Sequence, residues 1–293
     1  MEAAETLEEL KKAKKDGEDR GALKTDTEYA ANLERIATNA FGAAKSLDDL
    51  NALKATYTNE GFDATKQTEL YNQALERLAQ DAYGTAKNLD DLNSINTQYT
   101  NANLDSTKRT ELYRDSLINL GNSYSHAKDE IKKYEEAIKS NDATAIASAE
   151  SQLKNAIKLG EVANKLGLNA DELNKLTSNL SKGFGEGFEN ALKYAQGYLI
   201  LAEKLGISVE DLQSNLADLT GAFSSLTYAQ IDTLFNKIAS AAEQSNLDIN
   251  ALTKATIEIG DALNLSSDKA VNTATLFMTA SEEYGLSTEE LVF

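Results

Sequence analysis

The 293-residue chain contains no proline, no cysteine and no tryptophan. Without cysteine, these residues form no disulfide bond, no thiolate nucleophile and no thiolate metal site. Without proline, the residue that most disrupts a helix interior is missing, so helix ends have to be marked by Gly, Ser, Asn and Asp. The remaining composition is rich in Ala, Leu, Lys and Glu, which favours helices over strands.

Positive charge is also scarce, and the formal net charge is −18. An acidic surface repels phosphate, so we expect no direct binding to nucleic acid or to anionic lipid. Basic residues cluster locally at 11–15, but glutamates at 5–9 share the same segment. We therefore interpret residues 1–24 as a charged helical segment, with an anion-binding arm as the alternative.

Long apolar runs are absent as well. The most apolar stretch, Tyr198–Ala202, has five residues, whereas a membrane-spanning helix needs roughly 20. Met1 leads into acidic and polar residues rather than a basic stub and an apolar segment. We expect neither a membrane segment nor a signal peptide.

A 42-residue repeat dominates the first half of the chain. Residues 33–66 align without gaps to residues 75–108, and 19 of the 34 aligned positions are identical, which indicates internal duplication. A third copy starts at "TELYRDSLINL" (Thr110–Leu120) and then diverges. Apolar residues at i, i+3, i+4 and i+7 spacing predict two helices in each copy.

The residues before the second helix of each copy predict N-caps. Ser46 and Asn88 precede paired aspartates, 48–49 and 90–91, whose carboxylates suit the positive end of a helix dipole. General acid/base chemistry or a cation site is the alternative, but adjacent carboxylates on a first turn diverge and no Ca²⁺-loop spacing surrounds them. We predict helix capping.

The second half has a different rhythm, in which a short corner recurs. "KLGLNADEL" (Lys165–Leu173), "KLGISVEDL" (Lys204–Leu212) and "EYGLSTEEL" (Glu283–Leu291) share one pattern, while residues 245–252 and 263–270 are looser versions. The residues that end the helices, 167, 206, 246 and 285, are 39, 40 and 39 positions apart. This spacing predicts two short helices in each repeat.

Glycine and capping side chains explain the corner. Glycine adopts the left-handed conformation that ends a helix, the next apolar residue folds back onto the last turn, and Asn, Ser or Asp caps the following helix. We therefore predict an all-α fold, an array of short helices in helix-corner-helix pairs, either α-solenoid-like or an elongated bundle. The predicted divisions are residues 1–24, 25–141 and 142–293, with the last boundary at Lys139–Ala145.

No group of residues predicts catalysis. The segment "KGFGEGFENA" (Lys182–Ala191) has three glycines, but no strand precedes it and no Gly-Lys-Ser/Thr ending follows, so we interpret it as a helix break or a close helix contact. His126, the only histidine, is predicted to be a surface residue. The repeat tyrosines, 29, 57, 71, 83, 99 and 113, are predicted to be core or groove wall. We expect a protein that is not an enzyme, with no catalytic, cofactor-binding or metal-binding residues.

The second half resembles the helical segments of bacteriophage tail tape-measure proteins. The resemblance covers residues 160–293 and is clearest over Leu205–Leu291, where Ala-rich short helices alternate with Gly-apolar-Ser corners. It implies a virion structural protein that sets tail length, binds tail-tube and tail-assembly proteins including chaperones, and is ejected ahead of the DNA. It also implies location in the virion, or in the host cytoplasm during assembly.

Two features depart from that family pattern, since no long apolar segment or extended coiled coil occurs and the 42-residue duplication is not a family hallmark. The last residues, "STEELVF" (Ser287–Phe293), open a helix without completing it, so we expect the N-terminal part of a longer chain. The alternatives are a helical repeat scaffold that binds protein partners in a groove, with self-association allowed, or another internal or ejected virion protein.

Overall fold

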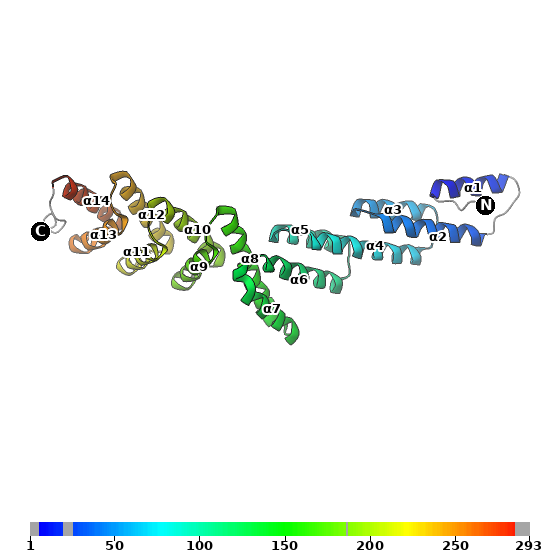
Figure 1. The fold of residues 1–293 in the computed structure, drawn as a ribbon, viewed down its shortest axis with the longest axis horizontal. Helices are drawn as coiled ribbons and strands as arrows, with labels where there is room; N and C mark the ends of the chain where they lie inside the picture. The colour runs from blue at the N-terminus through cyan, green and yellow to red at the C-terminus, as the bar shows by residue number, and fades with distance from the viewer. Residues whose placement is uncertain (1–5, 20–25, 186, 285–293) are drawn as a thin grey trace. The chain divides into compact units, whose positions relative to one another are not determined.

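The computed structural model describes residues 6–19, 26–185 and 187–284. Over these residues, the secondary structure consists of fourteen α-helices and one short 3-10 helix, with no strand (Figure 1). This confirms the predicted all-α array. In the described part of the chain, no helix combines the length and the apolar character needed to cross a bilayer.

Tertiary contacts divide the chain into two compact units, Met1–Ile157 and Lys158–Phe293. The first unit contains α1 (Leu7–Asp19), α2 (Asp26–Ala43), α3 (Leu47–Asn59), α4 (Ala64–Gly84), α5 (Leu89–Asn101), α6 (Ser106–Asn122), η1 (Ser125–Ala127), α7 (Lys128–Ser140) and the first part of α8 (Ala143–Leu166). The second contains the rest of α8, then α9 (Ala170–Phe184), α10 (Phe188–Leu205), α11 (Val209–Ala222), α12 (Tyr228–Ser245), α13 (Ile249–Leu263) and α14 (Ser267–Tyr284).

The division between the units falls within α8, later than the change of sequence rhythm near residue 142. A corner does form there, because Asn141 adopts a left-handed conformation with φ 54° and Asp142 caps α8 through the amides of Thr144 and Ala145. The side chains of Leu153 and Ile157 are nevertheless buried in the core of the first unit. The helix after the corner thus completes the packing of the repeats before it.

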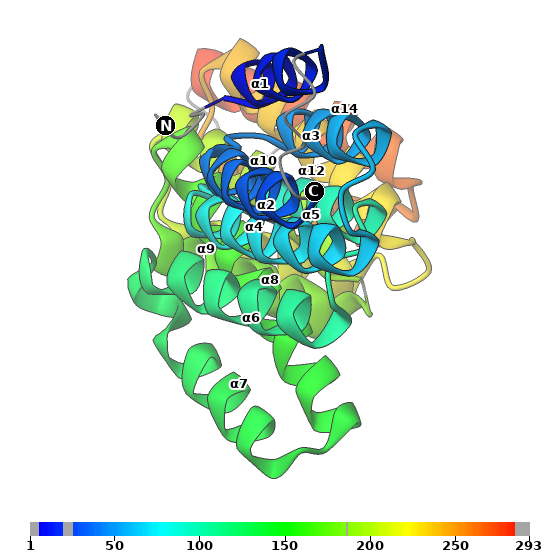
Figure 2. The same ribbon diagram turned by 90° about the vertical axis from the view of Figure 1, so that its right-hand side faces the viewer.

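In the first unit, α2, α4 and α6 form one row, with α3 and α5 packed beside it (Figure 2). Leu33, Leu75 and Leu117 lie 42 residues apart, one on each helix of that row, and all three side chains are buried. The 42-residue duplication in the sequence therefore corresponds to a repeated packing unit.

Polar ties between neighbouring helices repeat with the same period. The Tyr71 hydroxyl donates a hydrogen bond to Asn51 Oδ1 at 2.9 Å, and the Tyr113 hydroxyl donates to Asn93 Oδ1 at 3.2 Å. Each pair is displaced from the other by 42 residues, so side-chain detail is repeated along with the helices.

The first unit also contains corners that the sequence patterns did not predict. Gly61 and Asn103 have φ of 68° and 58°, and the amides that follow, of Phe62 and Leu104, each donate to the tyrosine carbonyl five residues earlier at 3.0 Å. Asp63 then caps α4. The two repeat families thus share the same kind of corner. In the first unit, the apolar residue that folds back is Phe62 or Leu104.

The basic cluster near the N-terminus lies on α1. Residues 20–25, which follow α1, are outside the described part. Leu10 is buried, Lys11 forms an ion pair with Glu60, and the Lys14 ammonium lies 4.5 Å from the centre of the Tyr29 ring. These contacts agree with the amphipathic-helix interpretation, because the cluster is partly used in packing α1 on the first unit.

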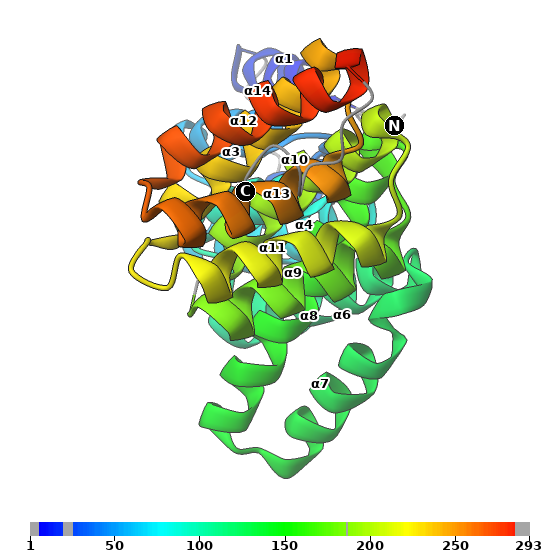
Figure 3. The same cartoon turned by 90° about the vertical axis from the view of Figure 1, so that its left-hand side faces the viewer.

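In the second unit, α9, α11 and α13 form one row and α10, α12 and α14 form the other (Figure 3). Consecutive helices pack as pairs, and helices of one row also contact each other, as α11 does with α13 and α12 with α14. The core between the rows is apolar and includes Leu212, Phe235 and Leu252, none of which is exposed.

The corners predicted in this unit are confirmed at residues 167, 206 and 246. Gly167, Gly206 and Asn246 have φ of 69°, 68° and 54°, and the amide of each following residue donates to the carbonyl five residues earlier at 2.9 to 3.0 Å. The looser corner at 263–270 forms in the same way at Asn264, with φ 48°. Gly285 lies outside the described residues.

Candidate partner-binding groove

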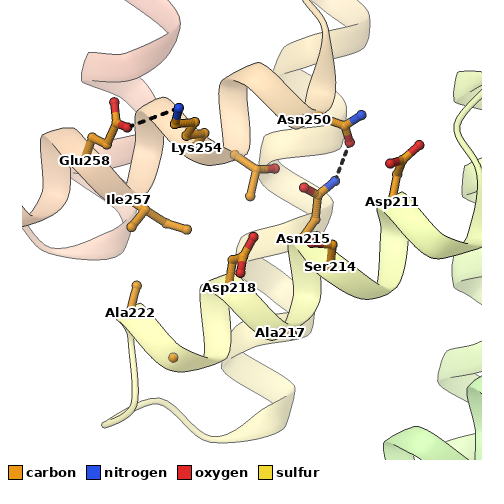
Figure 4. Close-up of a pocket in the computed structure, with 12 residues that line it drawn as sticks. Asp211, Ser214, Asn215, Ala217, Asp218, Ala222, Asn250, Lys254, Ile257 and Glu258 are labelled. Carbon is orange, nitrogen blue, oxygen red and sulfur yellow. Dashed lines mark hydrogen bonds and ion pairs between the residues drawn. The ribbon is translucent and has the colours of Figure 1, made fainter.

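A hollow of about 660 Å³ lies between α11 and α13 in the second unit (Figure 4). The facing side of α11 carries small residues, Ser214, Ala217, Gly221 and Ala222, which leave the space between the two helices unfilled. Asn215 Nδ2 donates to Asn250 Oδ1 at 2.7 Å and ties the helices together at one end. The result is an open groove whose two helices are tied at one end, rather than a closed cavity.

The charge of this groove is negative. Asp211, Asp218 and Glu258 line it, against a single cation, Lys254. The Lys254 ammonium lies 3.8 Å from the Glu258 carboxylate, and both side chains are mostly exposed, so this pair contributes little. Asp211 accepts the Ser208 hydroxyl at 2.8 Å in the first turn of α11, and neither Asp211 nor Asp218 forms an ion pair among the described residues. The groove therefore attracts positive charge.

A buried polar group without a partner lies at the groove. Thr253 is 1% exposed, and its hydroxyl makes no hydrogen bond within the described residues. Thr256, one turn along the same helix, is equally buried, but its hydroxyl donates to Leu252 O at 2.7 Å. Since an unsatisfied buried hydroxyl costs free energy, the Thr253 side chain is an exception that needs an explanation.

A second hollow, of about 510 Å³, lies between α9 and α11. Its walls are more apolar, with Leu176, Leu180 and Leu216, and Gln213 contributes a buried Nε2 that also has no partner in the described residues. Gln213 and Thr253 are 40 residues apart, which is the spacing of the corner residues Gly206 and Asn246. Equivalent positions in successive repeats thus present unpaired polar atoms, each at the hollow on the same side of its helix.

Ala217 lines both hollows, so they adjoin each other across α11. We call the two hollows together the α9–α11–α13 groove. The sequence patterns did not predict it, although the run of small and polar residues in "DLQSNLADLTGA" (Asp211–Ala222) is a signal that could have pointed to a helix face without a large apolar partner.

The predicted N-caps are confirmed, and the second aspartate of each pair takes part in the capping. The Ser46 hydroxyl accepts from the Asp49 amide at 3.1 Å, and the Asp49 carboxylate accepts from the Lys45 amide at 3.1 Å. Asn88 and Asp91 make the same reciprocal arrangement in the next repeat. These carboxylates serve the helix termini.

The glycine-rich segment 182–191 forms the junction between two helices. Helix α9 ends at Phe184, Gly185 adopts a left-handed conformation with φ 67°, and α10 begins at Phe188 after its N-cap, Gly187. This matches the interpretation as a helix break, and the residue at 186 lies outside the described part.

His126 differs from the prediction of a simple surface residue. Its side chain is half-buried, Nε2 lies 2.8 Å from Ala156 O, and its ring lies 6.0 Å from that of Tyr124. The prediction was wrong in this respect because the polar sequence around His126 folds into η1, from which the ring reaches the Ala156 carbonyl of α8. His126 links two elements of the first unit.

The repeat tyrosines lie mainly in the core, as predicted. Tyr57, Tyr71, Tyr83 and Tyr99 are buried, and Tyr29 and Tyr113 are partly buried. Burial raises the pKa of Tyr83 to about 12. It raises the pKa of Tyr134 to about 12 and that of Tyr198 as well, so these phenols stay protonated and neutral at physiological pH.

The fold and the site define an all-α protein of stacked helix pairs, with the α9–α11–α13 groove along one row of its second unit. The chain matches no protein-family model. It also matches no curated protein and no solved structure.

Proposed function

We propose that the protein is a non-enzymatic helical repeat scaffold that binds a protein partner in the α9–α11–α13 groove. The observation that carries this proposal is the unpaired, buried hydroxyl of Thr253 at the groove between two helices of one row. A buried polar group at a groove finds its missing hydrogen bond when a ligand fills the groove.

The repeat architecture supports the same proposal. Stacked helix pairs present one row of helices as a continuous surface, and such surfaces commonly bind extended or helical partners. In this chain, regular corners set the spacing of α9, α11 and α13, so that equivalent residues recur along the row.

A capture experiment with a groove-blocking variant tests the proposal. Ala217 is exposed and lines both hollows, so Ala217→Trp fills the groove without touching the core. Ala229 is exposed on α12 and lines neither hollow, so Ala229→Trp is the matched control. We expect the immobilised wild type and the control to retain the same proteins from a host lysate at low salt, and Ala217→Trp to lose them.

Two results would count against the scaffold. One is an identical set of proteins on all three forms, which would place binding elsewhere. The other is no specific capture by the wild type at low ionic strength, where charge-assisted contacts are strongest.

A role as a phage tail tape-measure protein is the second candidate. Its support is the series of Gly-apolar-Ser corners over Leu205–Leu291, the part of the chain that resembles that family. In this setting, the partners of the scaffold are tail-tube and tail-assembly proteins. The pairing of helices in the structure shortens any ruler, so measurement of length would require the helix pairs to open.

If a phage encodes the chain, deletion of one repeat from its gene tests this second candidate. Residues 67–108 make up one 42-residue period, so their removal rejoins the repeats in register. If the chain is a ruler in an opened helical form, we expect tails shorter by about 60 Å, at ~1.5 Å per residue. Tails of unchanged length, or a gene that does not lie among tail genes, would speak against it.

A further inference from the structure

We propose that the partner of the α9–α11–α13 groove is an extended, basic peptide segment that crosses the three helices. This inference rests on the proposed scaffold function and names the chemistry of its partner. Three independent features of the groove support it, namely its course across the helices, its unpaired polar atoms and its charge.

The course of the groove favours an extended chain. The two hollows lie on either side of α11 and share Ala217, so a ligand that fills both runs across the helix axes. Helices in contact are about 8–10 Å apart, and an extended peptide advances ~3.3 Å per residue. About three residues therefore pass each helix, and a peptide of about nine residues spans the row.

The polar atoms suit a peptide backbone. Gln213 Nε2 is a donor without an acceptor, and the Thr253 hydroxyl both donates and accepts. A backbone carbonyl satisfies the first, and a backbone carbonyl or amide satisfies the second. Because Gln213 and Thr253 are one repeat apart, on the neighbouring helices α11 and α13 of the same row, they bond to successive parts of one extended chain.

The Thr253 hydroxyl lies below the groove surface, since its residue is 1% exposed. A ligand reaches it through a change of rotamer in the groove wall, and such changes are common when complexes form. The neighbouring Asn215 and Asn250 side chains line the same groove and supply further amide groups, and that of Asn250 is half-buried.

The charge selects basic side chains. Asp218 and Asp211, whose carboxylate accepts the Ser208 hydroxyl, form no ion pair among the described residues, and Glu258 has only the exposed Lys254. The described residues include no group of three acidic or histidine side chains placed to hold a metal ion. We therefore assign the carboxylates to a larger ligand with several separated positive charges.

Fluorescence anisotropy with defined peptides tests the inference on the full chain. The probe is a labelled nonapeptide of alternating Lys and Ser, which is extended and basic, and the comparison peptide replaces Lys with Glu. We expect the wild type to bind the basic peptide, more weakly as salt rises, and not to bind the acidic one.

Single substitutions with matched controls then locate the contacts. Asp218→Asn is expected to weaken binding about two- to fivefold, as for a partly exposed ion pair, while Asp261→Asn on the exposed surface of α13 leaves it unchanged. Thr253→Val is expected to weaken binding about three- to tenfold through loss of one hydrogen bond, and Thr256→Val, whose hydroxyl bonds within its own helix, is expected to leave it unchanged.

The inference is overturned if the acidic peptide binds as well as the basic one, if neither peptide binds, or if Thr253→Val binds like the wild type. The scaffold proposal is judged separately by the lysate capture. If capture depends on Ala217 but neither peptide binds, only the basic-peptide inference is refuted. If the lysate capture and the peptide titration both fail, the scaffold proposal is refuted as well.

Discussion

Replacement of Thr253 by valine is expected to stabilise the protein in the absence of any partner. Valine keeps the branched shape of threonine, and the two residues have similar helix propensities, so the main change is the loss of a buried hydroxyl. That hydroxyl has no hydrogen bond, and an unsatisfied buried group costs about 1–3 kcal/mol. We expect the free energy of unfolding of the second unit to rise by about 1 kcal/mol.

Thr256→Val is the internal control for this prediction. Both threonines lie on α13 and are almost completely buried, with exposed fractions of 1% and 0%. Only the Thr256 hydroxyl has a partner, Leu252 O at 2.7 Å, so its removal loses a hydrogen bond worth about 0.5–1.5 kcal/mol. The two substitutions are therefore expected to have opposite signs.

Urea denaturation followed by circular dichroism at the helical band provides the measurement. The midpoint of Thr253→Val should move to higher urea and that of Thr256→Val to lower urea, with unchanged slopes, since neither changes the surface exposed on unfolding. A Thr253→Val protein that is destabilised as much as Thr256→Val would show that the Thr253 hydroxyl already has a partner, and the main support for the groove would be lost.

Three further predictions concern the corners, the caps and the tyrosines. Gly206→Ala should lower the unfolding free energy by about 1–2 kcal/mol because φ is 68° there, whereas Gly197→Ala, on the exposed face of α10, should raise it by up to about 1 kcal/mol in urea titrations. Ser46→Ala should cost about 1 kcal/mol in the same assay through loss of the bond from the Asp49 amide. Burial raises the pKa of Tyr83 to about 12, so folding favours its neutral form. The contribution of Tyr83 to the free energy of unfolding should therefore be intact below pH 10 and fall by about 1.4 kcal/mol per pH unit as the pH rises towards 12.

Each of these predictions has its own contradicting result. Equal effects of the two glycine substitutions would show that the left-handed conformation at Gly206 does not contribute to stability. An unchanged midpoint for Ser46→Ala would show that the N-cap hydrogen bond of Ser46 does not stabilise the protein. For the tyrosines, tyrosinate absorbance is free of tryptophan background in this chain. A Tyr83→Phe protein with the same alkaline unfolding profile as the wild type would refute the assigned pKa shift.

The corners and the helix pairs could be predicted from the sequence because their causes are local. A left-handed residue such as Gly206, an apolar residue after it and a cap such as Ser208 act within one turn of helix, and their spacing is visible without the fold. The repeated N-caps at Ser46 and Asn88 were visible for the same reason. Local chemistry sets the ends of the helices, and the spacing of these ends sets the repeat.

The groove and the unit boundary could not be predicted in this way, because they depend on contacts between distant residues. Ile157 joins the first core, although the sequence rhythm changes before it at residues 139–145. Thr256 donates its hydroxyl to the i−4 carbonyl of its own helix and Thr253 does not, a difference in side-chain orientation that the sequence does not reveal. His126 was similarly misjudged, since its partner, Ala156 O, is 30 residues away.

The most direct test of the proposed groove is an amide chemical-shift titration of the isotope-labelled full chain with the Lys/Ser nonapeptide. The account predicts shifts along the facing sides of α9, α11 and α13, including the amides of Gln213 and Thr253, and none along α12 and α14. Shifts confined to the row of α10, α12 and α14, or spread evenly over the acidic surface, would contradict it.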